Sequence, residues 1–141
     1  MIQNRKARHD YTLLKEYTAG IVLVGSEVKS LRAGDASIVD SFVYISNDEV
    51  FLKGAHIGRY KQLAHEEVRD RKLLLNRKEI RDLQKQVKEK KGLTIIPLVV
   101  IERAGKLKLK ISVARGKKTW DKKEALKEKD IKLQTKRELN Q

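Results

Sequence analysis

The chain has 141 residues, and its 33 lysines and arginines against 19 aspartates and glutamates give a formal net charge of +14. A small domain this basic usually binds a polyanion, which favours RNA or DNA as its partner over a merely well-solvated surface. The absence of cysteine excludes disulfides and thiol catalysis, while the absence of a long apolar run or an apolar leader predicts a cytoplasmic protein with no membrane partner.

The N-terminal part predicts an irregular segment, then strands, then a helix. Residues 1–9 are basic and show no clear period. Strand-like patterns follow over residues 10–17 and 20–24, with a break at Thr18–Gly20. Residues 25–34 then have the composition of a short helix.

That short helix has signals at both ends. Ser26 can serve as its N-cap, Glu27 suits the positive end of the helix dipole, and Gly34 can adopt the left-handed conformation after the last turn. Val28 and Leu31 lie three residues apart, so they can hold one face of the helix against a core.

The middle of the chain predicts a hairpin and a connection. Residues 37–57 alternate between apolar and polar positions around a turn at residues 46–49, which indicates two antiparallel strands. Residues 58–71 show no sustained period, so we expect an extended or partly helical connection there.

The clearest helix of the sequence comes next. Asn76 followed by Glu79 predicts a capping box at its start, and Gly92 marks its end. Its apolar stripe is narrow and consists of Ile80, Leu83 and Val87. The other faces are rich in lysine and arginine.

Two long strands complete the predicted fold. Residues 93–103 and 106–115 are joined by a short turn at Ala104–Gly105, and Pro97 predicts an edge or a bulge because it cannot donate a ladder hydrogen bond. Strict alternation in the second strand predicts one buried face and one wet, basic face. The buried set is Leu107, Leu109, Ile111 and Val113, and the wet set is Lys108, Lys110 and Ser112.

These elements predict a mainly β protein with helices. Several short antiparallel strands with one capping helix fit an oligonucleotide-binding-like closed antiparallel β-barrel. The alternative is a flat sheet with helices on one face, as in RRM-type domains, but no strand shows the aromatic arrangement that those domains use. We divide the chain into an RNA-binding barrel domain at residues 1–116 and a tail at residues 117–141.

The tail differs in composition from the barrel domain. Residues 115–141 carry ten lysines and arginines against five acidic residues, and their apolar residues form no stripe that could pack on a core. Helix nucleation is costly without packing. We therefore expect a basic, flexible tail that is disordered when free and helical on a partner.

The sequence offers little support for catalysis. His9, His56 and His65 are scattered, and no second histidine completes a metalloprotease helix. There is no glycine-rich phosphate loop either. We therefore predict that the protein is not an enzyme and uses no cofactor or metal ion.

Three basic surfaces favour nucleic-acid binding instead. They are the N-terminal segment with Arg5, Lys6 and Arg8, the region of residues 69–78, and the "ARGKK" run that contains Arg115. Any one of them could be only a solubilising face. Three on one small domain point to RNA or DNA.

Three stretches of the chain resemble signature sequences of one family. They are "NRKARHDYTLLKEYTAGIVLVGSEVKSLRAGDASIVDSF", "RDRKLLLNRKEI" and "ARGKKTWDKK", and they look like the SsrA-binding proteins, known as small protein B. The resemblance runs in order over residues 4–123. It implies an oligonucleotide-binding-like barrel of about six antiparallel strands with three helices and a flexible basic tail.

The resemblance also implies a function. Family members bind the tRNA-like domain of transfer-messenger RNA (tmRNA) and bring it to stalled 70S ribosomes, which then tag the incomplete product in trans-translation. One alternative is a structural ribosomal or rRNA-binding barrel protein without a rescue role. Another is a general single-strand binder, which needs a row of exposed aromatic residues, although only 5% of the chain is aromatic.

The resemblance further implies which residues bind RNA. Glu27, Leu74 and Asn76 match positions at the surface that meets the tRNA-like domain. Glu27 would accept hydrogen bonds from RNA or order neighbouring cations, and basic residues would contact phosphates. The full predicted set is Arg5, Arg8, Glu27, Lys29, Arg32, Leu74, Asn76, Arg115, Lys117 and Lys118.

The tail is expected to contact the ribosome. By resemblance it enters the decoding centre and message channel of the small-subunit rRNA, with Trp120, Asp121, Lys122 and Lys123 at the contact. The Trp120 side chain can stack on an unpaired rRNA base. The alternative is that it packs back on the barrel. Lys123 stands where relatives have arginine, which forfeits a bidentate contact.

Overall fold

Two long strands organise the fold of this protein. In the computed structural model, which describes residues 2–59 and 65–117, β8 (Leu93–Arg103) and β9 (Lys106–Gly116) pair along their whole length. Ala104 and Gly105 form the turn between them, and both have positive φ, as a tight type I′ hairpin turn requires. The predicted hairpin is therefore confirmed, and the predicted irregularity at Pro97 is a bulge between Pro97 and Val99.

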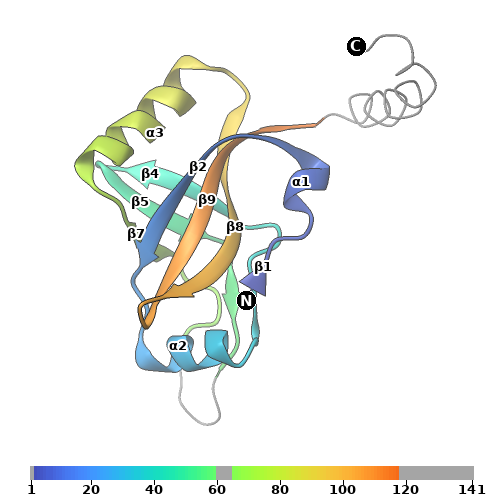
Figure 1. Cartoon of the computed structure of the whole chain (residues 1–141), viewed down its shortest axis with the longest axis vertical. Helices are drawn as coiled ribbons and strands as arrows, with labels where there is room; N and C mark the ends of the chain where they lie inside the picture. The colour runs from blue at the N-terminus through green and yellow to red at the C-terminus, as the bar shows by residue number, and fades with distance from the viewer. Residues whose placement is uncertain (1, 60–64, 118–141) are drawn as a thin grey trace, which may run out of the picture.

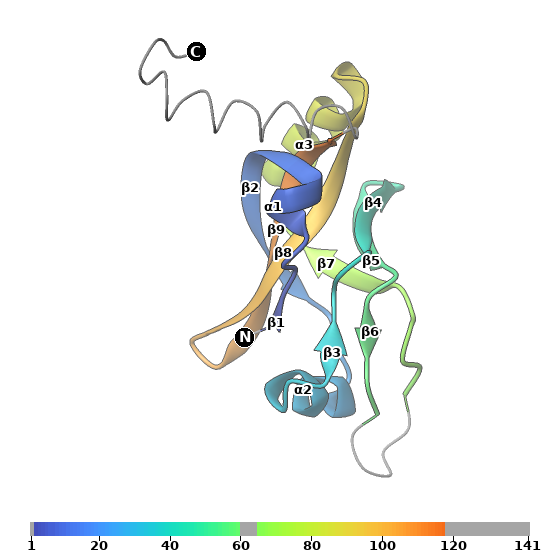
Figure 2. The ribbon, with the colours of Figure 1, turned by 90° about the vertical axis from the view of Figure 1, so that its right-hand side faces the viewer.

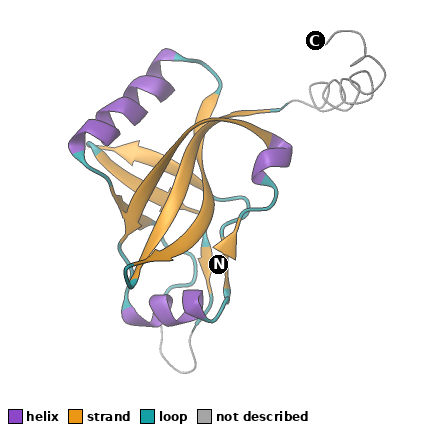
Figure 3. Cartoon of the chain, viewed as in Figure 1, coloured by secondary structure: helices purple, strands orange, loops and turns teal. Residues whose placement is uncertain are grey.

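The remaining elements surround this hairpin, as Figure 1 shows. The strands are β1 (Ile2–Gln3), β2 (Tyr11–Ile21), β3 (Ala36–Ser37), β4 (Phe42–Ser46), β5 (Glu49–Lys53), β6 (His56–Ile57) and β7 (Arg71–Leu74). The helices are α1 (Ala7–Asp10), α2 (Gly25–Arg32) and α3 (Arg77–Glu89). Figure 3 shows that strands dominate and that three helices accompany them, as predicted.

All strand pairs are antiparallel. The main sheet has the order β1-β8-β4-β5-β7-β2-β9, and β8 additionally pairs with β9, while β3 and β6 form a separate two-stranded sheet. Figure 2 shows β4, β5 and β7 on one side and the long strands β2, β8 and β9 on the other. Since α2 and α3 lie at opposite ends and α1 lies beside β1 (Figure 1), the flat sheet with helices on one face is wrong.

The core lies between the two sides of this sheet. The predicted inward residues of β9 are buried: Leu107, Leu109, Ile111 and Val113. Leu31 of α2 and Leu83 of α3 close the core, with Val28, Ile80 and Val87 packed against it. The apolar stripes predicted for both helices are therefore confirmed.

The opposite face of β9 is not uniformly wet. Ser112 was expected on the wet face, but it is buried and its hydroxyl donates to the carbonyl of Val113. The cause is the N-terminal segment, which is not irregular: β1 pairs with β8, and Ala7 of α1 packs with Ile96 and Ala114 in a second small core.

One further sequence prediction is wrong. The break expected at Thr18–Gly20 does not exist, because these residues pair with β9 inside one continuous strand β2, whose irregularity lies between Leu13 and Lys15. The connection over residues 58–71, which was expected to be extended or partly helical, contains no helix in its described part, which ends by entering β7.

The ends of the helices follow their caps. In α3, the Asn76 side chain accepts from the Glu79 N–H at 2.8 Å and the Asn76 N–H donates to Glu79 Oε1 at 3.1 Å, so the predicted capping box is confirmed. Gly34 has φ +81° after α2, as predicted. Ser26 is not the N-cap, because α2 already begins at Gly25 and Val24 holds the N-cap position.

Candidate nucleic-acid interface

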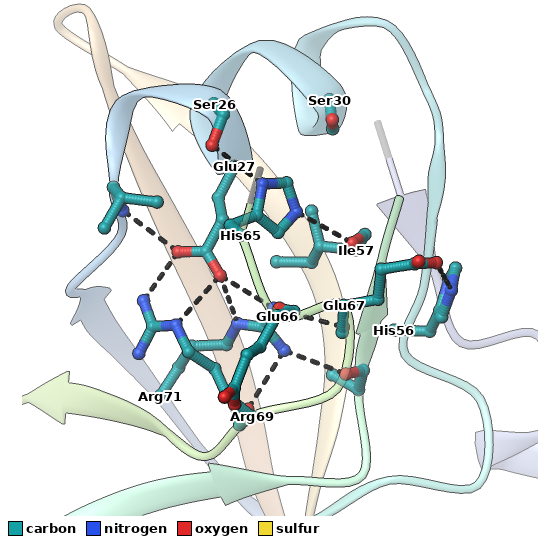
Figure 4. Close-up of polar contacts among 12 residues, drawn as sticks. Ser26, Glu27, Ser30, His56, Ile57, His65, Glu66, Glu67, Arg69 and Arg71 are labelled. Carbon is teal, nitrogen blue, oxygen red and sulfur yellow. Dashed lines mark hydrogen bonds and ion pairs between the residues drawn. The ribbon is translucent and has the colours of Figure 1, made fainter. Parts of the chain in front are cut away.

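A buried ion cluster joins the start of α2 to the segment that precedes β7 (Figure 4). The Glu27 carboxylate has no exposed surface and accepts from two arginines. Arg71 donates to Glu27 Oε2 from Nη2 at 2.7 Å and from Nε at 3.0 Å. Arg69 donates to Oε1 from Nη2 at 2.6 Å and to Oε2 from Nε at 3.1 Å. One carboxylate therefore orients two cations.

Arg71 is the centre of this cluster. Its side chain is fully buried, and besides Glu27 it donates to the carbonyls of Ala55 and Arg69 from Nη1 and of Glu66 and Glu67 from Nη2, at 2.9–3.2 Å. A buried guanidinium is stable only when its donors are satisfied in this way. Arg71 therefore fixes the path of residues 66–69 beside α2.

Glu27 is ionised in this environment. Burial alone would raise its pKa, but hydrogen bonds from Arg69, from the Val24 N–H at 2.9 Å and from Arg71 outweigh burial and lower the pKa below its ordinary value. A lowered carboxyl pKa stabilises the fold at neutral pH, and this contribution is lost as the pH falls through the ordinary and then the folded pKa. The cluster is therefore acid-sensitive.

His65 ties the same segment to α2 at a second point. Its Nε2 lies 3.0 Å from the Ile57 carbonyl, and its Nδ1 lies 2.7 Å from the Ser26 hydroxyl. Because a carbonyl oxygen can only accept, Nε2 donates to Ile57, and the Ser26 hydroxyl pairs with Nδ1. Ser26 thus holds His65 (Figure 4) instead of capping the helix.

The geometry bears on the two roles considered for Glu27. A carboxylate with no exposed surface cannot meet RNA without rearrangement, whereas the ordering of neighbouring cations is what the structure displays. Lys29 and Arg32 lie exposed further along α2, and Arg32 Nη2 bonds Glu102 Oε2 and the Gly105 carbonyl, both at 3.2 Å. Two basic side chains are therefore exposed on α2, and Arg32 is paired with an acidic residue.

Leu74 and Asn76 lie together where β7 leads into α3. Leu74 is 53% exposed because it follows the buried Leu73 and points to the opposite face of β7, and Asn76 is committed to the helix cap. Leu74 lies against Gly20 of β2, where an added Cβ would come within 3.3 Å of the Leu74 Cβ. The missing side chain of Gly20 therefore leaves room for Leu74 beside β2.

A buried tyrosine fixes α3, and with it Asn76, to the sheet. The Tyr17 hydroxyl donates to Asp82 Oδ2, and Lys15 Nζ donates to the same oxygen at 2.5 Å. Burial, followed by the hydrogen bond to Asp82, raises the pKa of Tyr17 above its ordinary value, so its hydroxyl remains a donor.

The other predicted RNA-binding residues lie elsewhere. Arg5 and Arg8 line a cavity of about 450 Å³ beside β8 and β9. Lys117 is held next to them, since its N–H donates to the Asp10 carbonyl at 2.8 Å and its Nζ to the Arg8 carbonyl at 3.3 Å. The structure thus brings Arg5, Arg8, Arg115 and Lys117 to the α1 end, away from α2 (Figure 1). Lys118, Trp120, Asp121, Lys122 and Lys123 lie outside the described residues.

Sequence reasoning found the basic region of residues 69–78, but not that Arg71 is fully buried or that Arg69 binds the same buried carboxylate. One feature of the sequence could have revealed the burial of Arg71. Arg71 and Leu73 are two residues apart in one strand, so their side chains point to the same face, and a buried Leu73 implies a buried Arg71. Among residues 2–59 and 65–117, no group of acidic or histidine side chains could hold a metal ion. No helix of that part has the length and hydrophobicity needed to cross a bilayer.

Fold and charge together define a small, strongly basic β protein of the kind that binds polyanions. The SmpB protein family matches residues 1–141. The SsrA-binding protein of Sulfurihydrogenibium sp. is 53% identical over 132 residues, which cover 92% of this chain and 86% of the relative. That of Nocardioides sp. is 50% identical over 136 residues, which cover 94% and 85%. This chain therefore belongs to the SmpB family.

A solved structure agrees with this assignment. A chain presented under the words "tmRNA-SmpB: a journey to the center of the bacterial ribosome" is 42% identical to this protein, with a TM-score of 0.71. The match covers 89% of this chain and 93% of that chain. The resemblance to the SsrA-binding proteins seen in the sequence is confirmed.

Proposed function

We propose that this protein binds the tRNA-like domain of tmRNA and delivers it to stalled 70S ribosomes for trans-translation. The observation that carries the proposal is family membership over the whole chain, with relatives named SsrA-binding proteins at 50–53% identity. The similar solved chain comes from work on tmRNA, SmpB and the ribosome. The net charge of +14 suits a partner of RNA.

Within this function the protein acts as an adaptor without catalysis, in the cytoplasm where ribosomes translate. We propose that its fold is an oligonucleotide-binding-like closed barrel of residues 1–116. Support comes from the pairing of β8 with β4, β4 with β5, β5 with β7, β7 with β2, β2 with β9, and β9 with β8. This series of strand pairings starts and ends at β8, as the strands of a closed barrel do.

The proposed RNA contacts form three groups. Lys29 and Arg32 lie on α2 with the ion cluster, where Glu27 acts by ordering Arg69 and Arg71. Leu74 and Asn76 lie where β7 leads into α3. Arg5, Arg8, Arg115, Lys117 and Lys118 form the group at the α1 end. The tail of residues 117–141, with Trp120, Asp121, Lys122 and Lys123, is proposed to occupy the decoding centre and message channel.

Sequencing the RNA that co-purifies with the full-length protein tests the function. An adaptor should enrich tmRNA strongly and join stalled ribosomes only transiently. A structural ribosomal protein would instead be present at one copy per subunit and would enrich rRNA. A general single-strand binder would prefer unstructured RNA. Recovery of rRNA alone would therefore contradict the proposal.

The salt dependence of binding should reveal the phosphate contacts. Lysines that neutralise phosphates release counterions, so affinity for the tRNA-like domain should fall steeply as salt rises. Replacing Lys117 and Lys118 together by alanine should lower the slope of log K against log salt by about 1–2. Lys85 and Lys90, which are exposed and outside the proposed contacts, provide a control of equal charge when replaced together. An unchanged slope would show that Lys117 and Lys118 do not contact the RNA.

Asn76→Ala should weaken binding to the tRNA-like domain by roughly 1–3 kcal/mol, because a polar partner is lost at the interface. It should also destabilise α3 by about 0.5–2 kcal/mol through loss of the N-cap. Asn76→Ser is the matched control, since serine caps a helix well but lacks the amide group. If both variants bind RNA as the unchanged protein does, Asn76 serves the helix alone.

A further inference from the structure

The outward face of β4, β5 and β7 carries an uncovered group of aromatic side chains. Because Val43, Val50 and Leu52 are buried, the alternate residues of β4 and β5 point away from the core. Those residues include Phe42, Tyr44 and Phe51, which are three of the five aromatic residues that the structure describes. We call these three the aromatic surface.

Two rings of the aromatic surface, those of Tyr44 and Phe51, are fixed relative to each other. Tyr44 and Phe51 pair across the two strands with ring centroids 5.3 Å apart and planes inclined by 23°. The Tyr44 hydroxyl donates to Asp70 Oδ2 at 2.6 Å, which sets the orientation of its ring. Phe42 remains 43% exposed, so a large planar group is presented to solvent.

The aromatic surface is continuous with residues already proposed to contact RNA. Phe51 pairs with Lys72 of β7, and Leu74 lies two residues further along the same face of that strand. Val22, which is 44% exposed, bonds the Lys72 carbonyl through its N–H at 2.9 Å. An exposed apolar band of this length on a soluble chain marks a binding surface.

Charge and shape both favour a nucleic acid as the occupant. Lys53, which pairs with Phe42, is exposed and makes no ion pair among the described residues. Lys72 beside Phe51 adds no free charge, because Glu49 Oε2 lies 2.7 Å from its Nζ. A cavity of about 600 Å³ opens beside Phe42 and Tyr44, between β4, β8 and α3, with Lys88 at its edge. β4 meets β8 through the single pair Val43 and Ile95, which leaves the cavity room.

We propose that Phe42, Tyr44 and Phe51 stack on unpaired bases of the bound RNA. This inference rests on the proposed function and adds the kind of nucleotide that is recognised: a base outside a duplex, held by its planar face and not by its sequence. Phosphates on either side would meet Lys53 and Lys88. This arrangement could not be predicted from the sequence, because Phe51 meets Tyr44 only through the register of β4 with β5.

Removing the rings while keeping apolar bulk tests the stacking. In the full-length protein, Phe42→Leu combined with Phe51→Leu should weaken binding of the tmRNA tRNA-like domain about tenfold or more. Phe42→Tyr combined with Phe51→Tyr keeps both planar faces and should bind normally. Leu14→Ala, at an exposed apolar residue of β2 outside this surface, controls for general loss of surface contacts. Thermal unfolding shows that each variant is folded.

Photo-crosslinking supplies a direct second measurement. RNA of the tRNA-like domain made with 5-iodouridine should crosslink to Phe42, Tyr44 or Phe51, as mapped by mass spectrometry. Normal RNA binding by the leucine double variant, with crosslinks only elsewhere, would overturn the inference and leave the proposed function intact. Loss of ribosome association by that variant with normal RNA affinity would assign the surface to a protein partner instead. If the unchanged protein does not bind this RNA, the proposed function itself fails.

Discussion

Glu27→Ala is expected to lower the free energy of unfolding by about 3–5 kcal/mol, because it leaves the buried Arg71 without its counter-charge. Arg69 would lose two bonds at the same time. Urea unfolding at neutral pH measures the change. RNA binding of this variant must be measured where it is still folded, since partial unfolding would imitate a lost contact.

Two controls separate the buried charge from surface electrostatics. Glu49→Ala breaks an exposed ion pair with Lys72 and should cost no more than about 1 kcal/mol. Glu27→Gln keeps the shape but not the charge, so its unfolding midpoint should vary less with acid than that of the unchanged protein. A Glu27→Ala protein with unaltered stability would show that Arg71 finds other partners and that the cluster is dispensable.

Truncation after Lys117 is expected to abolish most tagging of stalled products while leaving the melting temperature nearly unchanged. The last described strand ends at Gly116, and the Lys117 N–H already donates to the Asp10 carbonyl. The proposed decoding-centre residues would be missing. Affinity for the isolated tRNA-like domain should fall only modestly, through the loss of a few exposed charges.

Thermal unfolding, RNA binding and reconstituted tagging on the same proteins test this expectation. Trp120→Ala should reproduce part of the tagging loss if its ring stacks on rRNA, whereas Trp120→Tyr should retain most activity. A truncated protein that melts many degrees lower would mean that the tail packs on the body. Normal tagging after truncation would remove the ribosomal role proposed for the tail.

Local chemistry decided which elements could be predicted from the sequence. The capping box of Asn76 and Glu79, the alternation along β9 and the turn at Ala104 are properties of neighbouring residues, and all were predicted. The two-residue strands β1, β3 and β6 form only because a partner strand lies beside each of them. No local sequence pattern predicts strands this short. Ser26 was taken as the N-cap because the bond to His65, 39 residues away, is invisible in the sequence.

The candidate site was predictable in position more than in mechanism. The positions of Glu27, Leu74 and Asn76 came from resemblance, but burial of Glu27 follows from Arg71, which is 44 residues distant. A lone arginine in a basic region looks like a solvated charge until its strand partners are known. Tertiary pairing therefore changes Glu27 from a contact residue into one that orders two cations.

The length of the β8–β9 hairpin makes the sheet a spacer between two ends of the molecule. At one end, Arg32 of α2 bonds the Gly105 carbonyl in the hairpin turn. At the other end, Lys117 leaves β9 beside α1. Eleven residues of β9 separate these points, which corresponds to at most about 37 Å along an extended strand. A protein that must contact two RNAs at the same time needs a fixed distance between its two contact regions. Lengthening or shortening both strands by two residues would shift one anchor point relative to the other by about 7 Å and leave the chemistry of each end untouched.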